Sequence, residues 1–261
     1  MEVVVVPTPE DAATLVADAY SALLRRTPAA VLGLATGSTP LPVYRELARR
    51  HRDEGLSFAR ARGFLLDEYV GLPTGHPERY REFIRTELEQ HVDFAPGAIV
   101  GPGDLDVAAL EAGPAYEQLI REAGGIDLQI LGIGTDGHLA FNMPMSSLSS
   151  RTRLKTLTPR TRHDNARFFD GDLDQVPTHC LTQGLATILD SRHAVMLGFG
   201  RGKAQAVREA VEGPLSSRWP ASVLQLHPHA TVVVDEDAAS QLAFTDYYRT
   251  TYAGKPVGQG L

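Results

Sequence analysis

A carboxylate and an imidazole stand two residues apart in a glycine-rich stretch of this sequence. The stretch, residues 132–138, reads GIGTDGH and carries Asp136 and His138. The apolar run before it, residues 126–131, predicts a buried strand. Asp136 and His138 would then follow the carboxyl end of that strand, where open α/β sheets bind ligands. The pattern favours acid/base chemistry; the alternative is a plain strand-to-helix loop in which Asp136 caps a helix and His138 is solvated.

Two other segments have the composition of phosphate sites. Residues 35–40 (ATGSTP) place hydroxyls at the predicted start of a helix, with Pro40 in its first position. Converging N–H groups and the positive end of the helix dipole suit a phosphate. Lys203 follows the glycine-rich run 198–202 and offers a cation. The alternatives are a helix cap that binds nothing and a solvated surface lysine.

A pair of adjacent carboxylates follows a further predicted strand. Residues 66–72 read LDEYVGL and contain Asp67 and Glu68. Two neighbouring negative charges repel each other unless one is paired or used, so one of them is a candidate general base. The alternative is an acidic turn at the surface.

Length and composition restrict the class of protein. The 261 residues, 43% of them hydrophobic, are enough for one large α/β domain over residues 1–261. A net charge of -7 without a basic block argues against nucleic acid and membrane surfaces as partners. The single cysteine, Cys180, excludes an internal disulfide and fits a reducing cytoplasm, and we interpret it as a packed thiol. The start, MEVVVVP, has no basic region and only a short apolar run, so it predicts a first strand rather than a signal or a membrane span.

Apolar runs alternate with helical patterns along the chain. This order predicts an α/β fold with a doubly wound, mostly parallel, Rossmann-like sheet and helices on both faces. The polar segment 143–183 has poor periodicity, which is typical of a segment that covers a site. The predicted strands are residues 3–6, 30–34, 63–66, 127–131, 194–199 and 231–234, and the predicted helices include residues 11–25, 41–50, 108–122 and 203–212.

The four candidate sites meet at one edge of such a sheet. A phosphate cradle, a carboxylate base and an Asp/His pair together predict acid/base chemistry on a phosphorylated sugar, without a cofactor. The alternative is a metal cluster of Asp, His and Glu side chains, but the spacing matches no metal motif, so we expect no metal site.

At this point the motifs become recognisable. Eight segments of the sequence have the order and spacing of the glucosamine-6-phosphate deaminase family. They are LATGSTP, LDEYVGL, GIGTDGHLAFN, SRTRLKTL, NARFFD, QVPTHCLTQG, GRGKAQAV and SVLQLHPHATVVVD. The sequence resembles that family over nearly its whole length. The related 6-phosphogluconolactonases share a GxGxDGH segment, but theirs typically continues toward TASLFP, and their acidic motif resembles DER. Both discriminating segments here resemble the deaminases.

The resemblance implies roles for the candidate residues. Asp67 corresponds to the general base that moves a proton between C2 and C1 of the open-chain aminosugar, so that a ketose phosphate forms and ammonia leaves. His138 corresponds to the residue that opens the sugar ring, and Asp136 to its orienting partner. The residues that correspond to phosphate and substrate contacts are Thr36, Gly37, Ser38, Thr39, Arg167 and Lys203.

The resemblance also implies regulation and assembly. It suggests a mobile lid over approximately residues 153–182 and a cytoplasmic homo-oligomer, with a hexamer favoured. Bacterial hexamers of the family bind N-acetylglucosamine 6-phosphate between subunits as an allosteric effector. The residues that correspond to that pocket are Ser146, Ser147, Arg153 and Lys155.

One position departs from the family pattern. Members usually read AFNEP, in which the glutamate completes a triad with the histidine and the aspartate, whereas this chain has Met143 there. A thioether carries no charge and exchanges no proton. Three hypotheses therefore stay open: a deaminase slowed at ring opening, a lactonase-like hydrolase of a phosphorylated sugar acid, and an aminosugar-phosphate sensor with weak catalysis.

Overall fold

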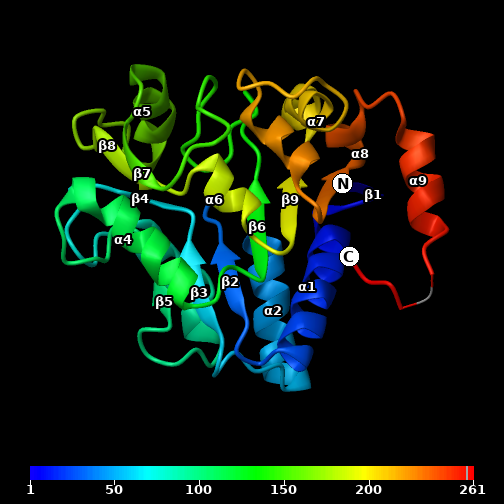
Figure 1. The fold of residues 1–261 in the computed structure, drawn as a ribbon, viewed down its shortest axis with the longest axis horizontal. Helices are drawn as coiled ribbons and strands as arrows, with labels where there is room; N and C mark the ends of the chain where they lie inside the picture. Colours follow the sequence, from blue (N-terminus) through cyan, green and yellow to red (C-terminus); the bar gives the residue numbers. More distant parts are fainter. Residues whose placement is uncertain (257) are drawn as a thin grey trace.

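A seven-stranded parallel sheet forms the centre of the computed structural model, which describes residues 1–256 and 258–261 (Figure 1). The strand order is β1-β10-β9-β6-β2-β3-β5, and each neighbouring pair is parallel. Parallel neighbours need crossover connections, so all carboxyl ends lie at one edge of the sheet. The strands are β1 (Glu2–Val6), β2 (Val31–Leu34), β3 (Arg62–Leu65), β5 (Ile99–Val100), β6 (Leu128–Gly132), β9 (Ala194–Gly198) and β10 (Ala230–Asp235).

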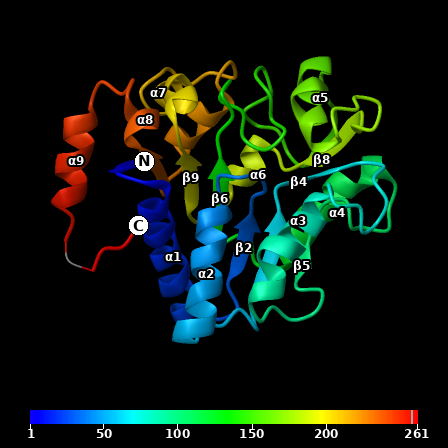
Figure 2. The same cartoon turned by 180° about the vertical axis from the view of Figure 1, so that it is seen from behind.

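Helices cover both faces of this sheet. α1 and α2 pack side by side on the face seen in Figure 2, and α4 and α6 lie on the face seen in Figure 1. In β2, Leu32 and Leu34 join the apolar cluster beneath α1 and α2, whereas Val31 packs with Phe64 and Tyr116 beneath α4. The predicted doubly wound sheet is confirmed. The helices are α1 (Pro9–Arg26), α2 (Leu41–Glu54), α3 (Tyr80–Glu87), α4 (Ala109–Glu122), α5 (Pro159–Asn165), α6 (Leu185–Leu189), α7 (Ala204–Val211), α8 (Glu236–Ala239) and α9 (Thr245–Ala253).

A second, antiparallel sheet of three strands was not predicted. Its order is β4-β8-β7, with β4 at Asp67–Tyr69, β7 at Arg153–Thr156 and β8 at His179–Thr182. Together with α5 it lies at the end of the molecule toward which the large sheet's arrows point (Figure 1). The predicted lid, residues 153–182, therefore begins and ends in paired strands, since β7 and β8 hydrogen-bond to each other.

Several predicted boundaries are wrong by a few residues. The strand expected at 63–66 ends at Leu65, because Leu66 passes the chain into β4. Pro40 is the N-cap of α2 rather than its first helical residue, and no hydroxyl caps that helix. Lys203 ends a 3₁₀ turn and precedes α7 instead of opening it. Within the described residues, no helix has the length and apolar character needed to cross a membrane.

Candidate active site

Asp67 is a buried carboxylate at the first position of β4. Only 7% of the residue is exposed. Its side chain has no hydrogen-bond partner among the described residues, 1–256 and 258–261. Burial raises the pKa of Asp67 well above its usual value, and the negative charge of Glu68 raises it further. An unpaired carboxylate with a raised pKa is a stronger proton acceptor than an exposed one.

Glu68 has the opposite environment, although it is the next residue. Its carboxylate accepts hydrogen bonds from the backbone N–H groups of Tyr69 at 2.8 Å, Tyr80 at 3.0 Å and Arg81 at 2.9 Å. The Arg79 guanidinium lies 3.7 Å away. Burial raises the pKa of Glu68, and these donors counteract the rise. Glu68 therefore anchors the start of α3, and Asp67 is the carboxylate left for chemistry.

The Asp136–His138 pair forms as the spacing predicted. His138 Nδ1 lies 2.6 Å from Asp136 Oδ1, and the hydrogen bond lowers the pKa of Asp136 to about 2. No helix follows this turn before β7, so Asp136 does not cap one. A Cβ at Gly134 would lie 2.2 Å from the His138 ring, and the position thus requires glycine. The Nδ1 contact leaves Nε2 of His138 available on a side chain that is 34% exposed.

One of the predicted cationic side chains, Lys203, lies near this pair. Burial lowers the pKa of Lys203, the negative charge of Asp136 counteracts that effect, and the positive charge of Arg167 adds to it. Arg167 lies in the exposed turn after α5, with its guanidinium 4.7 Å from the centre of the Phe168 ring. Lys203 therefore brings positive charge to the Asp136–His138 turn, and Arg167 comes near Lys203 from a different loop.

The predicted phosphate loop connects β2 and α2 at the same edge. Gly37 has a φ of 89°, a conformation that favours glycine, and both Gly37 and Ser38 are exposed. A Cβ at Gly132 would lie 3.9 Å from Thr39, so this loop lies beside the carboxyl end of β6. Thr36 is half-buried in the same loop. Exposed backbone at the start of a 14-residue helix suits an anionic group.

Met143 packs against an apolar cluster between the site and the lid. The cluster contains aromatic side chains of β4, of the turn after β6 and of the lid: Tyr69, Phe141 and Phe169, with Tyr80 at its edge. Met143 itself is partly buried. The thioether is therefore a packing residue in this chain.

The four residues of the predicted effector pocket are only partly assembled. Lys155 Nζ lies 3.2 Å from Ser146 Oγ. Burial lowers the pKa of Lys155, and the charge of Arg153 lowers it further, which places these two cations near each other. Ser147 is exposed and bonds to Ser149 at 3.0 Å instead.

Sequence reasoning missed a set of buried polar side chains between the two halves of the site. Three of these side chains are fully buried: Asn142, Thr182 and Gln183. Thr182 accepts a hydrogen bond from the N–H of Phe141, and Asn142 donates one to the Gln183 carbonyl. Thr182 and Gln183 end the polar segment 143–183 that was predicted to cover a site, and no spacing signal marked any of the three. Among the described residues, no cluster of three or more His, Cys, Asp or Glu side chains is placed to hold a metal ion.

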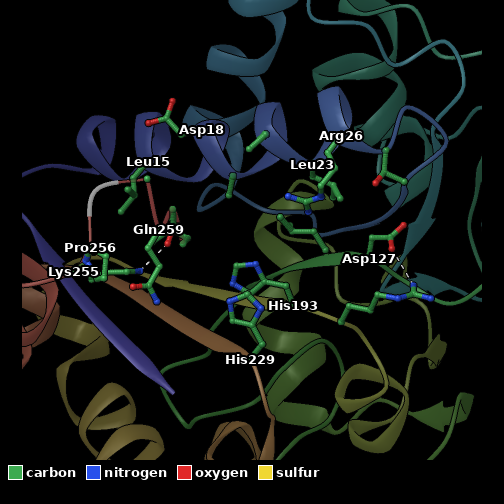
Figure 3. A pocket seen from close by; sticks show the side chains of 18 of the residues that line it. Leu15, Asp18, Leu23, Arg26, Asp127, His193, His229, Lys255, Pro256 and Gln259 are labelled. Atoms are coloured by element: carbon green, nitrogen blue, oxygen red, sulfur yellow. Dashed lines mark hydrogen bonds and ion pairs between the residues drawn. The ribbon is translucent and has the colours of Figure 1, made fainter.

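A cavity of about 930 Å³ lies at the opposite edge of the large sheet (Figure 3). Its lining includes residues just before or at the start of strands, such as Leu128, His193 and His229, together with α1 and the C-terminal segment. None of the described residues that line it is a predicted site residue. Its size alone does not outweigh the chemistry of the carboxyl edge, where the titratable groups converge.

Comparison with known proteins points to one family. The sequence pattern of the family described as glucosamine-6-phosphate isomerases/6-phosphogluconolactonase matches residues 8–234. A glucosamine-6-phosphate deaminase of Beutenbergia cavernae is 64% identical over 263 residues, covering 100% of both chains. Another, of Mycolicibacterium smegmatis, is 61% identical over 261 residues, again covering 100% of both chains.

Solved structures show the same fold. A monomeric glucosamine-6-phosphate deaminase has a TM-score of 0.87 and 41% identity, covering 92% of this chain and 100% of its own. A 6-phosphogluconolactonase from Trypanosoma cruzi has a TM-score of 0.71 and 19% identity, covering 93% of this chain and 97% of its own. At that lower identity the likeness concerns the fold alone.

Proposed function

We propose that this chain, which belongs to the glucosamine-6-phosphate isomerase/6-phosphogluconolactonase family, converts glucosamine 6-phosphate to fructose 6-phosphate and ammonia. One observation carries the proposal at the level of chemistry: a buried, unpaired Asp67 lies at the same sheet edge as the 2.6 Å Asp136–His138 pair. A base and an acid/base pair at one edge suit an aldose-to-ketose proton transfer.

The reaction assigns these groups to successive steps. His138 moves a proton between the ring oxygen and the C1 hydroxyl, with Asp136 holding Nδ1 so that Nε2 faces the sugar. Asp67 then removes the C2 proton and returns it to C1, while one proton of the C2 amino group passes to the C1 oxygen. The resulting C2 imine takes up water and releases ammonia, leaving the ketose. Burial supports this role, because a raised pKa strengthens Asp67 as a base.

Phosphate recognition falls to the loop at the start of α2 and to two cations. The backbone near Thr36, Gly37, Ser38 and Thr39 would hold the phosphate, with Lys203 and Arg167 neutralising its charge. Arg167 belongs to the lid, residues 153–182, which would exclude water when it closes over the sugar.

The two alternative functions, a lactonase-like hydrolase and a sensor, are supported by fewer observations. Lactonases of solved structure share the fold, but their sequence identity to this chain is only 18–21%. The sensor hypothesis rests on Met143 in place of the usual glutamate. Neither the buried Asp67 nor the Asp136–His138 pair is needed by a protein that only binds its ligand.

A coupled assay tests the proposed activity directly. Glucosamine 6-phosphate should yield ammonia and fructose 6-phosphate in equal amounts, and 6-phosphogluconolactone, tested in parallel, should not be hydrolysed. Turnover of the lactone alone would establish the hydrolase, and binding of the aminosugar phosphate without turnover would establish the sensor.

A second part of the proposal concerns regulation in a cytoplasmic homohexamer. Ser146, Ser147, Arg153 and Lys155 supply two hydroxyls and two cations suited to the phosphate of N-acetylglucosamine 6-phosphate. The 3.2 Å contact between Lys155 and Ser146 supports part of this pocket, and a neighbouring subunit would complete it.

The effector should bind away from the active site and raise the affinity for substrate. Sedimentation and substrate saturation with and without N-acetylglucosamine 6-phosphate measure both claims. The relative with 41% identity is described as monomeric, so a monomer is the specific alternative. A monomer in solution, or saturation that the effector leaves unchanged, would remove this part of the proposal.

A further inference from the structure

We infer that Asn142, Thr182 and Gln183 are positioning residues that set the spacing between Asp67 and the His138 turn. The inference rests on the proposed function, in which these two groups act on one substrate. Asp67 opens β4, whereas His138 lies in the turn after β6. Within the described residues, no hydrogen bond joins the two side chains, so other groups must hold them in register.

The end of β8 is attached to the Asp67 segment by main-chain and side-chain bonds. Thr182 is the antiparallel partner of Asp67. The backbone N–H of Gln183 donates to the Leu66 carbonyl at 2.7 Å, and its Nε2 donates to the Leu65 carbonyl at 3.0 Å. Both residues before the base are thereby fixed to β8.

The same end of β8 is attached to the His138 turn. Thr182 Oγ1 accepts a hydrogen bond from the Phe141 N–H at 3.2 Å. Asn142 Nδ2 donates to the Gln183 carbonyl at 2.8 Å and to the carbonyl of Leu139 at 3.0 Å. Leu139 directly follows the histidine. Asn142, Thr182 and Gln183 thus form a polar bridge, and all three are 0% exposed.

The turn that the polar bridge holds is strained. Ala140 has a φ of 51°, in the left-handed region, which is unfavourable for a non-glycine residue. Asn142 bonds the Leu139 carbonyl with both its side chain and its own N–H, the latter at 3.0 Å. Without the polar bridge the turn is free to relax, and the imidazole moves with it.

The polar bridge is not the most stable way to fill this buried space, because one of its polar atoms has no partner. Asn142 Oδ1 is buried and has no hydrogen-bond partner among the described residues. A buried carbonyl oxygen without a hydrogen-bond partner destabilises the folded state. The unpaired oxygen of the Asn142 carboxamide therefore lowers the stability of the fold, whereas its nitrogen connects the end of β8 to the His138 turn.

Isosteric variants test the polar bridge. Thr182→Val keeps the shape and removes the acceptor, and Thr182→Ser keeps the acceptor; Asn142→Leu removes both donations of the carboxamide. A misplacement of about 1 Å costs roughly 10²-fold in rate. We therefore expect kcat to fall about tenfold in Thr182→Val and about 100-fold in Asn142→Leu, with rescue in Thr182→Ser. KM should change less than about twofold, because the phosphate contacts are untouched.

Gln129→Met is the matched control. Gln129 is also 0% exposed, and its Nε2 donates only to the Ile130 carbonyl at 2.9 Å, within β6. Its kcat should stay near that of the wild type even where its thermal midpoint falls as far as in the bridge variants. An equal loss of kcat in the control, or unchanged kcat in Asn142→Leu, would overturn the inference.

A measurement independent of turnover separates this inference from the proposed function. The NMR signals of the His138 imidazole should move in Asn142→Leu and stay in place in Gln129→Met. If the wild type makes no fructose 6-phosphate and ammonia, the proposed function fails, but the NMR comparison still decides whether the polar bridge sets the position of the imidazole. Unmoved signals in Asn142→Leu would refute the positioning role.

Discussion

At the scale of single residues, we expect Asp67 to be needed for catalysis and to lower the stability of the fold. We expect Asp67→Asn to lose at least about 10²-fold in turnover while phosphate-ester binding stays nearly intact, because an amide keeps the shape but accepts no proton. The same change should raise the thermal midpoint at neutral pH, since it removes a buried, unpaired charge. Each kcal/mol gained would raise the midpoint by roughly 2–4 °C.

The sign of the pH dependence follows from the raised pKa of Asp67. The folded state holds this proton more tightly than the unfolded state, so the cost of the buried charge is present at neutral pH and disappears as the pH falls through the raised pKa. The advantage of Asp67→Asn should therefore shrink toward about pH 4, near the unfolded value. Thermal unfolding of both proteins over this range measures it. An active variant, or one less stable at neutral pH, contradicts the assignment.

Met143 stands where the family pattern has a glutamate that completes a triad with His138 and Asp136. Met143→Glu restores the carboxylate that the resemblance implies, and an oriented acid/base group is worth about 10²- to 10⁴-fold in rate. Ring opening should accelerate, and a C2-deuterated substrate should then show a larger isotope effect because proton transfer at C2 becomes limiting. The thermal midpoint should fall, since the new charge contacts the aromatic cluster of Tyr69 and Phe141.

Met143→Gln is the control, with similar shape and no charge. It should lower the thermal midpoint without raising the rate. If Met143→Glu increases neither the rate nor the isotope effect, the missing carboxylate does not limit turnover. The sensor hypothesis and the lactonase-like hydrolase, which acts on a different substrate, then gain support over the slowed deaminase.

At the scale of elements, α3 depends on the carboxylate next to the base. Glu68 accepts the N–H groups of Tyr80 and Arg81 at the first turn of α3, where a negative charge is favourable. In Glu68→Gln an NH₂ group replaces one acceptor and meets an N–H donor. We expect the free energy of unfolding in urea to fall by about 1–3 kcal/mol. Turnover per folded molecule should fall far less than in Asp67→Asn; the reverse ranking would make Glu68 the base.

Six of the seven strands of the large sheet were predictable because each consists mostly of apolar residues, whereas β5, with only two residues, was not predicted. β9 and β10 are buried on both faces, and such strands contain few polar positions. The strands β4, β7 and β8 were not predictable, because each has only three or four residues and mixed polarity. Their partners also come from segments far apart in the chain, and only tertiary pairing makes them strands.

The candidate site was likewise predictable only in part. Asp136 and His138 are two residues apart, so a local turn is enough to bring them together, and the contact is confirmed. The residue types alone did not distinguish Asp67 from Glu68, although the family resemblance indicated Asp67, because the answer depends on the N–H groups of α3. Asn142 was missed, since a polar side chain by itself predicts exposure and only the fold buries it.

At the scale of the whole molecule, titratable groups gather at both edges of the large sheet. The carboxyl edge holds the candidate site. The opposite edge holds a histidine pair beside the cavity, in which the His193 and His229 rings stack with centres 3.7 Å apart and planes 2° apart (Figure 3). His193 Nε2 also lies 3.0 Å from Thr231 Oγ1. This pair is far from the proposed chemistry and bears on the stability of the fold.

The histidine pair predicts a loss of stability in mild acid. Burial and, to a smaller extent, the positive charge that His229 and His227 would carry together lower the pKa of His193 to about 3. The unfolded chain, with a pKa near 6.5, therefore binds the proton more tightly. The stabilisation is complete above about pH 6.5 and is lost as the pH falls toward the folded value. Between about pH 7 and pH 5 this one group should remove about 2 kcal/mol.

Comparison of variants isolates that contribution from the carboxylates, which also protonate in acid. His193→Gln retains a polar group for Thr231 but cannot charge, so its unfolding free energy should fall by about 2 kcal/mol less than that of the wild type over the same range. His163→Gln, on the exposed side of α5, should keep the wild-type slope because this side chain is solvated in both states. Urea unfolding at each pH gives the slopes. If His193→Gln and the wild type lose stability in parallel, the stacked pair is protonated without cost, and the acid sensitivity of the fold lies elsewhere.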